Sequence, residues 1–191
     1  MPFRKITQIG HPVLRQKARP LTREELLAPA TQQLIDDMID TMRDAQGAGL
    51  AAIQVYEPVR IAVVEVTQNA RYPYKPPIPL TILVNPELTP IEDERFDNYE
   101  GCLSVPRLTG YVRRYRSVRV DGFDEHGEPR TWTFTGWPAR IAQHEIDHLN
   151  GVLYLDRVET RSLSTVENYA NLWSDQSLDQ IASTLGLDPT K

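Results

Sequence analysis

The stretch AQHEIDHLNG, residues 142–151, contains the pattern H-E-x-x-H and decides how the rest of the chain is interpreted. In a helix, residues four apart lie on the same face about one turn from each other, so His144 and His148 can both bind one metal ion. Glu145 is offset from that pair by one residue. A carboxylate beside a metal can take a proton from metal-bound water and later deliver it to a leaving group. The motif is therefore typical of metallohydrolases.

The residues around this motif predict a helix that follows a β-hairpin. Pro138 suits the first turn of a helix, and Gly151 is placed to end it. Upstream, SVRVDGFD (117–124) and RTWTFT (130–135) have the composition of strands. The segment EHGE (125–128) between them has the glycine and the length of a hairpin loop. We therefore expect both histidines on a regular helix.

The earlier part of the chain predicts a long N-terminal helix and further strands. After a capping-box pattern at 22–25, apolar residues recur at helical spacing, which predicts a long helix over roughly 30–46. The runs RIAVVEV (60–66) and LTILVNP (80–86) predict strands, and the proline-rich YPYKPPIP (72–79) predicts a loop. The expected fold class is α+β, with a mixed or antiparallel β-sheet packed around one central metal-binding helix.

Composition limits the organisation and the partners of the chain. Its 191 residues fit one catalytic domain, which we expect over 1–158, and 40% apolar content is enough for a core. The polar segment 159–191 has apolar residues at helical spacing and predicts a helical C-terminal tail. The net charge of −5 argues against DNA or an anionic membrane as a partner.

The N-terminus and the single cysteine indicate a cytoplasmic protein. MPFRKITQIG (1–10) has no apolar run behind its basic pair, so we expect neither a secretory signal nor a membrane span. One cysteine cannot build a disulfide framework. In a reducing compartment, a lone cysteine is more often buried, catalytic or a metal ligand.

A catalytic metal usually has three protein ligands and one open position, so a third ligand must join the histidines. Metzincin proteases have another histidine where this chain has Tyr154, which excludes that class. Glu167, nineteen residues after His148, is the ligand expected of an H-E-x-x-H endopeptidase. Cys102, in YEGCLSV (99–105), follows a glycine and precedes apolar residues, as the edge of a core strand does. These residues alone leave Glu167 and Cys102 open.

Four segments together resemble the peptide deformylase family in order and spacing. They are GHPVLRQKA (10–18), GAGLAAIQ (47–54), EGCLS (100–104) and QHEIDHLNG (143–151), and the resemblance covers roughly residues 8–158. It implies that Cys102, His144 and His148 bind one divalent metal ion. It also implies Fe2+ as the physiological ion, with Zn2+, Ni2+ or Co2+ able to substitute.

The resemblance implies hydrolysis of the N-formyl group from the N-terminal methionine of newly made polypeptides, near the ribosome. Metal-bound hydroxide would attack the formyl carbon, with Glu145 as general base and then general acid. The Leu50 backbone N–H and the Gln54 side chain would stabilise the oxyanion. The oligomeric state stays open. Substrate contacts are expected from Ala48, Gly49, Glu100, Gly101, Trp137 and Arg140.

Three positions leave their role open. Ala48 stands where many family members carry a branched aliphatic residue, so the methionine pocket is either wider here or filled by a neighbour. Arg107 lies earlier than the usual arginine after the cysteine motif, which puts an outer peptide subsite in doubt. Arg140, one turn before the first histidine, either faces the site, pairs with Glu100 or is a solvated charge.

Two further questions are whether the arginine-rich segment binds RNA and whether the chain is an inactive paralogue. The arginine-rich segment 107–119 is interpreted as a half-exposed strand pair with its arginines in solvent, rather than as an RNA-binding surface. Arg114 and Asp147 resemble a structural ion pair of the family. An inactive paralogue that only binds peptides is a third class of function. The chain argues against it by keeping Glu145, Gln54 and all three implied ligands.

Overall fold

The computed structural model of the chain describes residues 3–67 and 76–187 and has the α+β architecture expected from the sequence. Its helices are α1 (Arg23–Leu27), α2 (Pro29–Asp44), α3 (Trp137–Leu149), α4 (Val166–Leu172) and α5 (Leu178–Leu185). Four short 3-10 helices are η1 (Pro12–Arg15), η2 (Ala52–Val55), η3 (Tyr154–Asp156) and η4 (Thr160–Ser162). The strands are β1 (Gly49–Ala51), β2 (Ile61–Val66), β3 (Ile78–Pro90), β4 (Asn98–Cys102), β5 (Val105–Val112), β6 (Ser117–Phe123), β7 (Pro129–Thr135) and β8 (Ser164–Thr165).

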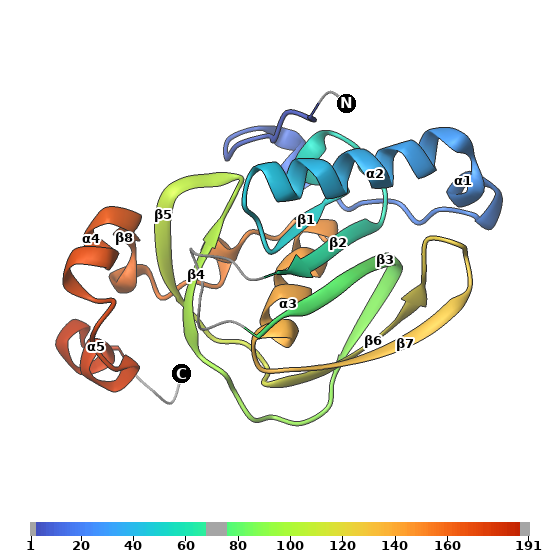
Figure 1. Cartoon of the computed structure of the whole chain (residues 1–191). Helices are drawn as coiled ribbons and strands as arrows, with labels where there is room; N and C mark the ends of the chain where they lie inside the picture. The colour runs from blue at the N-terminus through green and yellow to red at the C-terminus, as the bar shows by residue number, and fades with distance from the viewer. Residues whose placement is uncertain (1–2, 68–75, 188–191) are drawn as a thin grey trace.

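The strands form two antiparallel sheets (Figure 1). One has five strands in the order β1-β2-β3-β6-β7, and the other has three in the order β4-β5-β8. Within the described residues, parallel pairing is limited to the isolated bridge between Arg19 and Val59. Strand β1 is at one edge of the five-stranded sheet, and β4 is at one edge of the three-stranded sheet. Both strands carry predicted site residues.

Strand β2 explains how the five-stranded sheet is covered on both faces. Ala62, Val64 and Val66 belong to the core cluster that includes α3, whereas Ile61 and Val63 belong to the cluster that includes α2. Since successive side chains of a strand point to opposite faces, α2 and α3 lie on opposite sides of the sheet. A strand buried on both faces is apolar along its length, which accounts for the lack of alternation in this segment.

Helix α3 lies in the middle of the molecule (Figure 1) and contacts β1, β2, β3 and β7. Pro138 lies in its first turn, and the chain leaves the helix through Gly151, which has a φ of 75°. A Cβ at Gly151 would also lie 2.7 Å from the carbonyl oxygen of Arg15, so glycine meets a conformational and a steric need. The prediction of a regular helix under the histidine motif is confirmed.

The hairpin prediction is also confirmed, because β6 and β7 pair from Ser117–Thr135 to Phe123–Pro129. Helix α2 begins at Pro29 and ends at Asp44, where the sequence predicted 30–46. The pattern at 22–25 is a capping box, but it begins the short helix α1 instead of α2. The two helices are separate because the residue before a proline favours an extended conformation.

Two other segments differ from their predictions. Strand β3 begins at Ile78, so the end of the predicted loop 72–79 is strand, and residues 72–75 lie outside the described residues. The strand-pair interpretation of segment 107–119 is wrong, because β5 and β6 belong to different sheets. Alternation of residue types cannot distinguish a hairpin from a chain that crosses between sheets.

The C-terminal segment contains β8 and two short helices. Helix α5 begins at its own cap, where the Gln180 N–H donates to the Ser177 hydroxyl at 3.2 Å. Both helices pack on β4 and β5 through a cluster that includes Tyr99, Tyr111 and the buried Ile181. Among the residues that the structure describes, no helix is both long and apolar enough to cross a membrane.

Candidate metal centre

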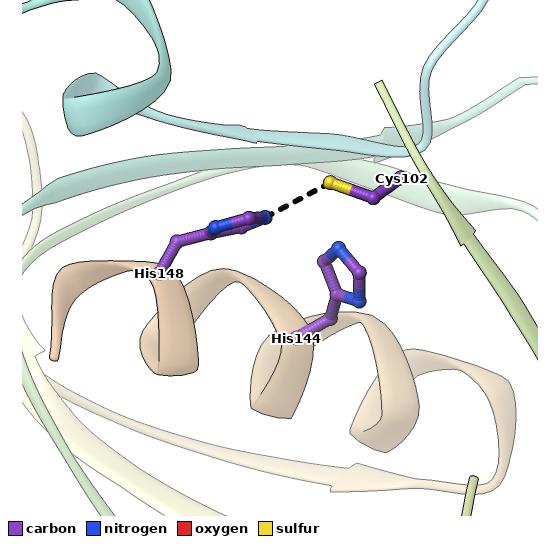
Figure 2. A group of neighbouring side chains, drawn as sticks. All are labelled: Cys102, His144 and His148. Carbon is purple, nitrogen blue, oxygen red and sulfur yellow. Dashed lines mark hydrogen bonds between the residues drawn. The ribbon is translucent and has the colours of Figure 1, made fainter. Parts of the chain in front are cut away.

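Cys102, His144 and His148 converge on one point between β4 and α3. The two imidazoles rise from successive turns of α3 toward the cysteine sulfur on the opposite side (Figure 2). One ligand atom from each residue lies within 4.8 Å of the others, and the Cys102 sulfur is 3.2 Å from His148 Nε2. Glu167, the alternative ligand, is exposed on α4 and does not belong to this group. The structure therefore favours the cysteine over the glutamate.

The chemistry of this group fits a divalent transition metal. A thiolate and two imidazoles are the donors that zinc and ferrous iron accept, and three ligands leave one position open. Burial and the nearby His144 hold the pKa of His148 well below its ordinary value, so this imidazole is neutral and able to ligate. Burial lowers the pKa of His144, but Cys102 and Glu100 together raise it well above its ordinary value. A metal cation bound at this point would have the Glu100 carboxylate behind one of its histidine neighbours.

Glu100 orients His144 through the ring nitrogen Nδ1. Its carboxylate lies 3.0 Å from His144 Nδ1, and it accepts two bonds from Arg114 at 2.9 Å and one from Arg140 at 2.8 Å. Burial raises the pKa of Glu100, but the charges and hydrogen bonds of these partners outweigh it and hold that pKa well below its ordinary value. A carboxylate on the far nitrogen of a ligating histidine fixes the ring and its tautomer.

Arg140 is paired and buried, so its interpretation as a solvated charge is wrong. Its side chain is 2% exposed, and besides Glu100 it donates to the carbonyl oxygens of Phe96, Asn98 and Val112. These bonds tie the first turn of α3 to β4 and β5. A guanidinium with five donors suits this role, because several acceptors surround it in a fixed plane.

Arg114 joins the same network from the end of β5. It is 3% exposed, and it pairs with Asp147 on α3 as well as with Glu100. Asp147 also accepts from Arg157 at 2.6 and 2.7 Å. The ion pair expected from the family resemblance is therefore present. The expectation that the arginines of 107–119 all lie in solvent is wrong for Arg114, because two buried carboxylates need its charge.

Glu145 is buried beside the ligands with one oxygen available. Its Oε2 has no hydrogen-bond partner among residues 3–67 and 76–187. Burial raises the pKa of Glu145 to about 7, against the opposing charge of His144. Its side chain lies so close to β1 that a Cβ at Gly49 would be 2.5 Å from Oε1. Glycine is needed at this position for room, and Glu145 is held in the place where a general base would act.

Gln54 is fixed with its amide nitrogen toward the ligands. Its Oε1 accepts from the Ala51 N–H at 2.8 Å, and its Nε2 donates to the Ser104 hydroxyl at 3.0 Å and lies 3.7 Å from the Cys102 sulfur. Leu50 is fully buried opposite Val63 in the β1–β2 ladder and does not line the cavity of the site. The structure thus brings Gln54 into the site and places the Leu50 side chain in the core.

A cavity of about 700 Å³ opens in front of the ligands. All six residues predicted to contact substrate border it, namely Ala48, Gly49, Glu100, Gly101, Trp137 and Arg140. Sequence reasoning missed two supporting residues. The Tyr154 ring stacks on His144 with 6.2 Å between centroids, and the Ser104 N–H donates to the Cys102 sulfur at 3.4 Å. Ser104 lies inside the segment EGCLS (100–104), and this position next to Cys102 is the signal that could have identified it.

Comparison with known proteins agrees with this geometry. The polypeptide deformylase family model matches residues 3–163. Peptide deformylase 2 of Ralstonia nicotianae is 43% identical over 157 residues, which cover 82% of this chain and 88% of the relative. Peptide deformylase 1 of Streptomyces coelicolor is 43% identical over 189 residues, which cover 96% and 86%.

A solved structure gives the same answer. The Met-Ala-Ser-bound class I type b peptide deformylase from Acinetobacter baumannii superposes with a TM-score of 0.80 at 39% identity. The match covers 82% of this chain and 99% of that one. The chain therefore belongs to the polypeptide deformylase family, the metal-dependent hydrolases that remove the N-formyl group from newly made polypeptides.

Proposed function

We propose that Cys102, His144 and His148 hold one divalent metal ion in this deformylase, and that Glu145 moves the protons of the reaction. The observation that carries the proposal is the convergence of the three ligand atoms within 4.8 Å, next to a buried carboxylate. A bound divalent ion would supply Lewis-acid chemistry and lower the pKa of a water molecule toward neutrality.

Glu145 acts first as base and then as acid. It takes a proton from the attacking water while the water oxygen forms its bond to the formyl carbon. It then donates that proton to the peptide nitrogen as the C–N bond breaks, which leaves formate and a free N-terminal amine. The free Oε2 and a pKa of about 7 support both roles, because a group with a pKa near the working pH exchanges protons in both directions.

Gln54 stabilises the negative oxygen of the tetrahedral intermediate. For Gln54, the support is an amide group already fixed by Ala51 and Ser104, since donors oriented in advance need no reorganisation during the reaction. Leu50 is left out of this role, because it lies within the β1–β2 ladder and does not border the cavity.

The substrate binds as an extended peptide between β1 and β4. Each is one of the two edge strands of its sheet in the described part of the chain, and Gly49 and Gly101 on these strands border the cavity. Outer strands offer backbone groups that an extended peptide can pair with. The Acinetobacter relative that binds Met-Ala-Ser supports a peptide that begins with methionine. Ala48 and Trp137 then contribute walls of the methionine pocket.

We infer indirect roles for Glu100 and Arg140, although both border the cavity. Their polar groups are bonded to each other, to His144 and to backbone carbonyls, which supports a role in holding the ligand and β4. We also infer one catalytic domain over 1–158, and Fe2+ as the physiological ion, with Zn2+, Ni2+ or Co2+ able to replace it. The substrate class favours the bacterial cytoplasm, near the ribosome.

Formate release from formyl-Met-Ala tests the proposal, with protein purified without oxygen and its metal content measured in the same sample. Glu145→Ala is expected to abolish release while the metal stays bound. Cys102→Ser is expected to lose metal, whereas Glu167→Ala keeps it. A metal-loaded Cys102→Ser variant and a metal-free Glu167→Ala variant would instead support the endopeptidase ligand set.

A further inference from the structure

The C-terminal segment borders the same cavity as the metal ligands. Six residues, from α4, the α4–α5 connection and the start of α5, line it together with Arg107 and Leu108 of β5, and we call these six the outer wall. These outer residues lie beyond 163, where the match to the family ends. They are Val166, Tyr169, Ala170, Ser174, Gln176 and Leu178.

This segment is fixed against the strand that carries Cys102. Strand β8 pairs with β5, so the chain enters α4 from a defined position. The Tyr169 ring packs on Tyr99 of β4 with 4.5 Å between centroids. From α5, Ile181 is 1% exposed in the cluster that contains both rings. Tyr169 therefore anchors the wall on β4, while the other residues of α4 are exposed.

The outer part of the cavity has the character of a peptide subsite. Leu108 and Val166 offer apolar surface and are 37% and 40% exposed, while Ser174 and Gln176 add exposed polar groups. An extended chain advances about 3.3–3.6 Å per residue, so residues after the methionine must leave the ligands along the cavity. A cavity of about 700 Å³ has room for more than one side chain.

We propose that α4 and the α4–α5 connection form an outer subsite for the peptide residues that follow the formyl-methionine. This subsite makes the enzyme select for longer peptides and for an apolar side chain after the second residue. The inference rests on the proposed function, since the occupant is the downstream part of the same substrate. The competing interpretation is that α4 only braces Tyr99 and has no contact with peptide.

Ala170 offers a test that leaves the packing of α4 in place, because it is exposed and borders the cavity. Ala170→Trp should obstruct the subsite. The kcat/KM for formyl-Met-Ala-Leu-Ser divided by that for formyl-Met-Ala is expected to fall about tenfold, the size of one lost apolar side-chain contact. Asn171→Trp is the matched control, because Asn171 is exposed on the same helix but does not border the cavity. Its ratio should equal that of the unchanged chain.

An unchanged ratio in Ala170→Trp, or the same fall in Asn171→Trp, would overturn the subsite and leave α4 as a brace. If the unchanged chain released no formate from either peptide, the proposed function would fail instead.

A second variant tests the polar side of the subsite by charge. Gln176→Lys should raise kcat/KM for a peptide with aspartate at the fourth residue over one with lysine by about threefold, as an exposed ion pair does. Ser183→Lys places the same charge on α5 away from the cavity and should leave that preference unchanged. Equal preferences in both variants would contradict the proposal.

Discussion

Replacing Gly49 with alanine tests how closely Glu145 must be held for catalysis. A Cβ at this position would lie 2.5 Å from Glu145 Oε1 and 2.7 Å from both Cγ and Cδ. An ordinary van der Waals contact begins at 3.4 Å, so the carboxylate must retreat by about 0.9 Å or β1 must move by as much. Glu145 is 4% exposed and borders the cavity, so a displaced carboxylate would take a different position relative to Cys102, His144 and His148.

The size of the effect follows from that displacement. A misplacement of about 1 Å of a catalytic group costs on the order of a hundredfold in rate. We therefore expect Gly49→Ala to lower kcat for formyl-Met-Ala by about a hundredfold. The three heavy atoms nearest to the new methyl group all belong to Glu145 and none to Cys102, His144 or His148, so metal content should be unchanged.

Gly47→Ala is the matched control. Its Cβ would meet the movable end of the Leu103 side chain at 2.9 Å and the Gly49 carbonyl oxygen at 3.3 Å, so a shift of Leu103 relieves most of the strain and Glu145 is not among the nearest atoms. Formate release, metal content and thermal unfolding would be measured on both variants. The reasoning is refuted if Gly49→Ala keeps more than about a third of normal kcat, or if Gly47→Ala loses as much as Gly49→Ala.

Three other changes have expected outcomes. Gln54→Ala should lower turnover by about a hundredfold or more with metal content unchanged, as loss of one oxyanion donor does, and near-normal turnover would remove Gln54 from the mechanism. Arg140→Met should lower the free energy of unfolding in urea by about 3 kcal/mol, because Glu100 loses a buried partner; a loss below about 1 kcal/mol would contradict that role. The hydrogen bond from Arg43 lowers the pKa of Glu65 below its ordinary 4.5, so this carboxylate stabilises the fold at neutral pH and that stability is lost as the pH falls through the lowered pKa. Glu65→Gln should therefore flatten the acid side of a curve of unfolding free energy against pH, and a curve of unchanged steepness would count against the pair.

The parts of the fold that were predictable are those with local signals. Pro138 and Gly151 delimit α3 through their own backbone preferences, and EHGE has the length of the β6–β7 loop. The spacing of His144 and His148 predicts a shared face without any knowledge of the fold. The capping box lies at its predicted position, but Pro29 separates α1 from α2, so the box begins a short helix of its own.

Local sequence signals could not predict the third metal ligand or the buried ion pairs that support the site. Cys102 lies 42 residues before His144 in the sequence, and only the family resemblance chose it over Glu167. The burial of Arg114 depends on Glu100 and Asp147, which come from different elements. An arginine is usually exposed, so a sequence pattern predicts exposure for it. Arg114 is an exception because its carboxylate partners are distant in the sequence.

Because the proposed ligands come from β4 and α3, a bound ion would also link the two sheets. Cys102 belongs to the three-stranded sheet, whereas α3 packs on the five-stranded one. An ion that binds only the folded chain adds about 2.7 kcal/mol of stability when present at a hundred times its Kd. Chelation should therefore speed amide hydrogen exchange in β4 more than in α3, whose core contacts with β2 do not depend on the ion. The ion would then determine how long the two sheets stay in contact at the site, in addition to its part in hydrolysis.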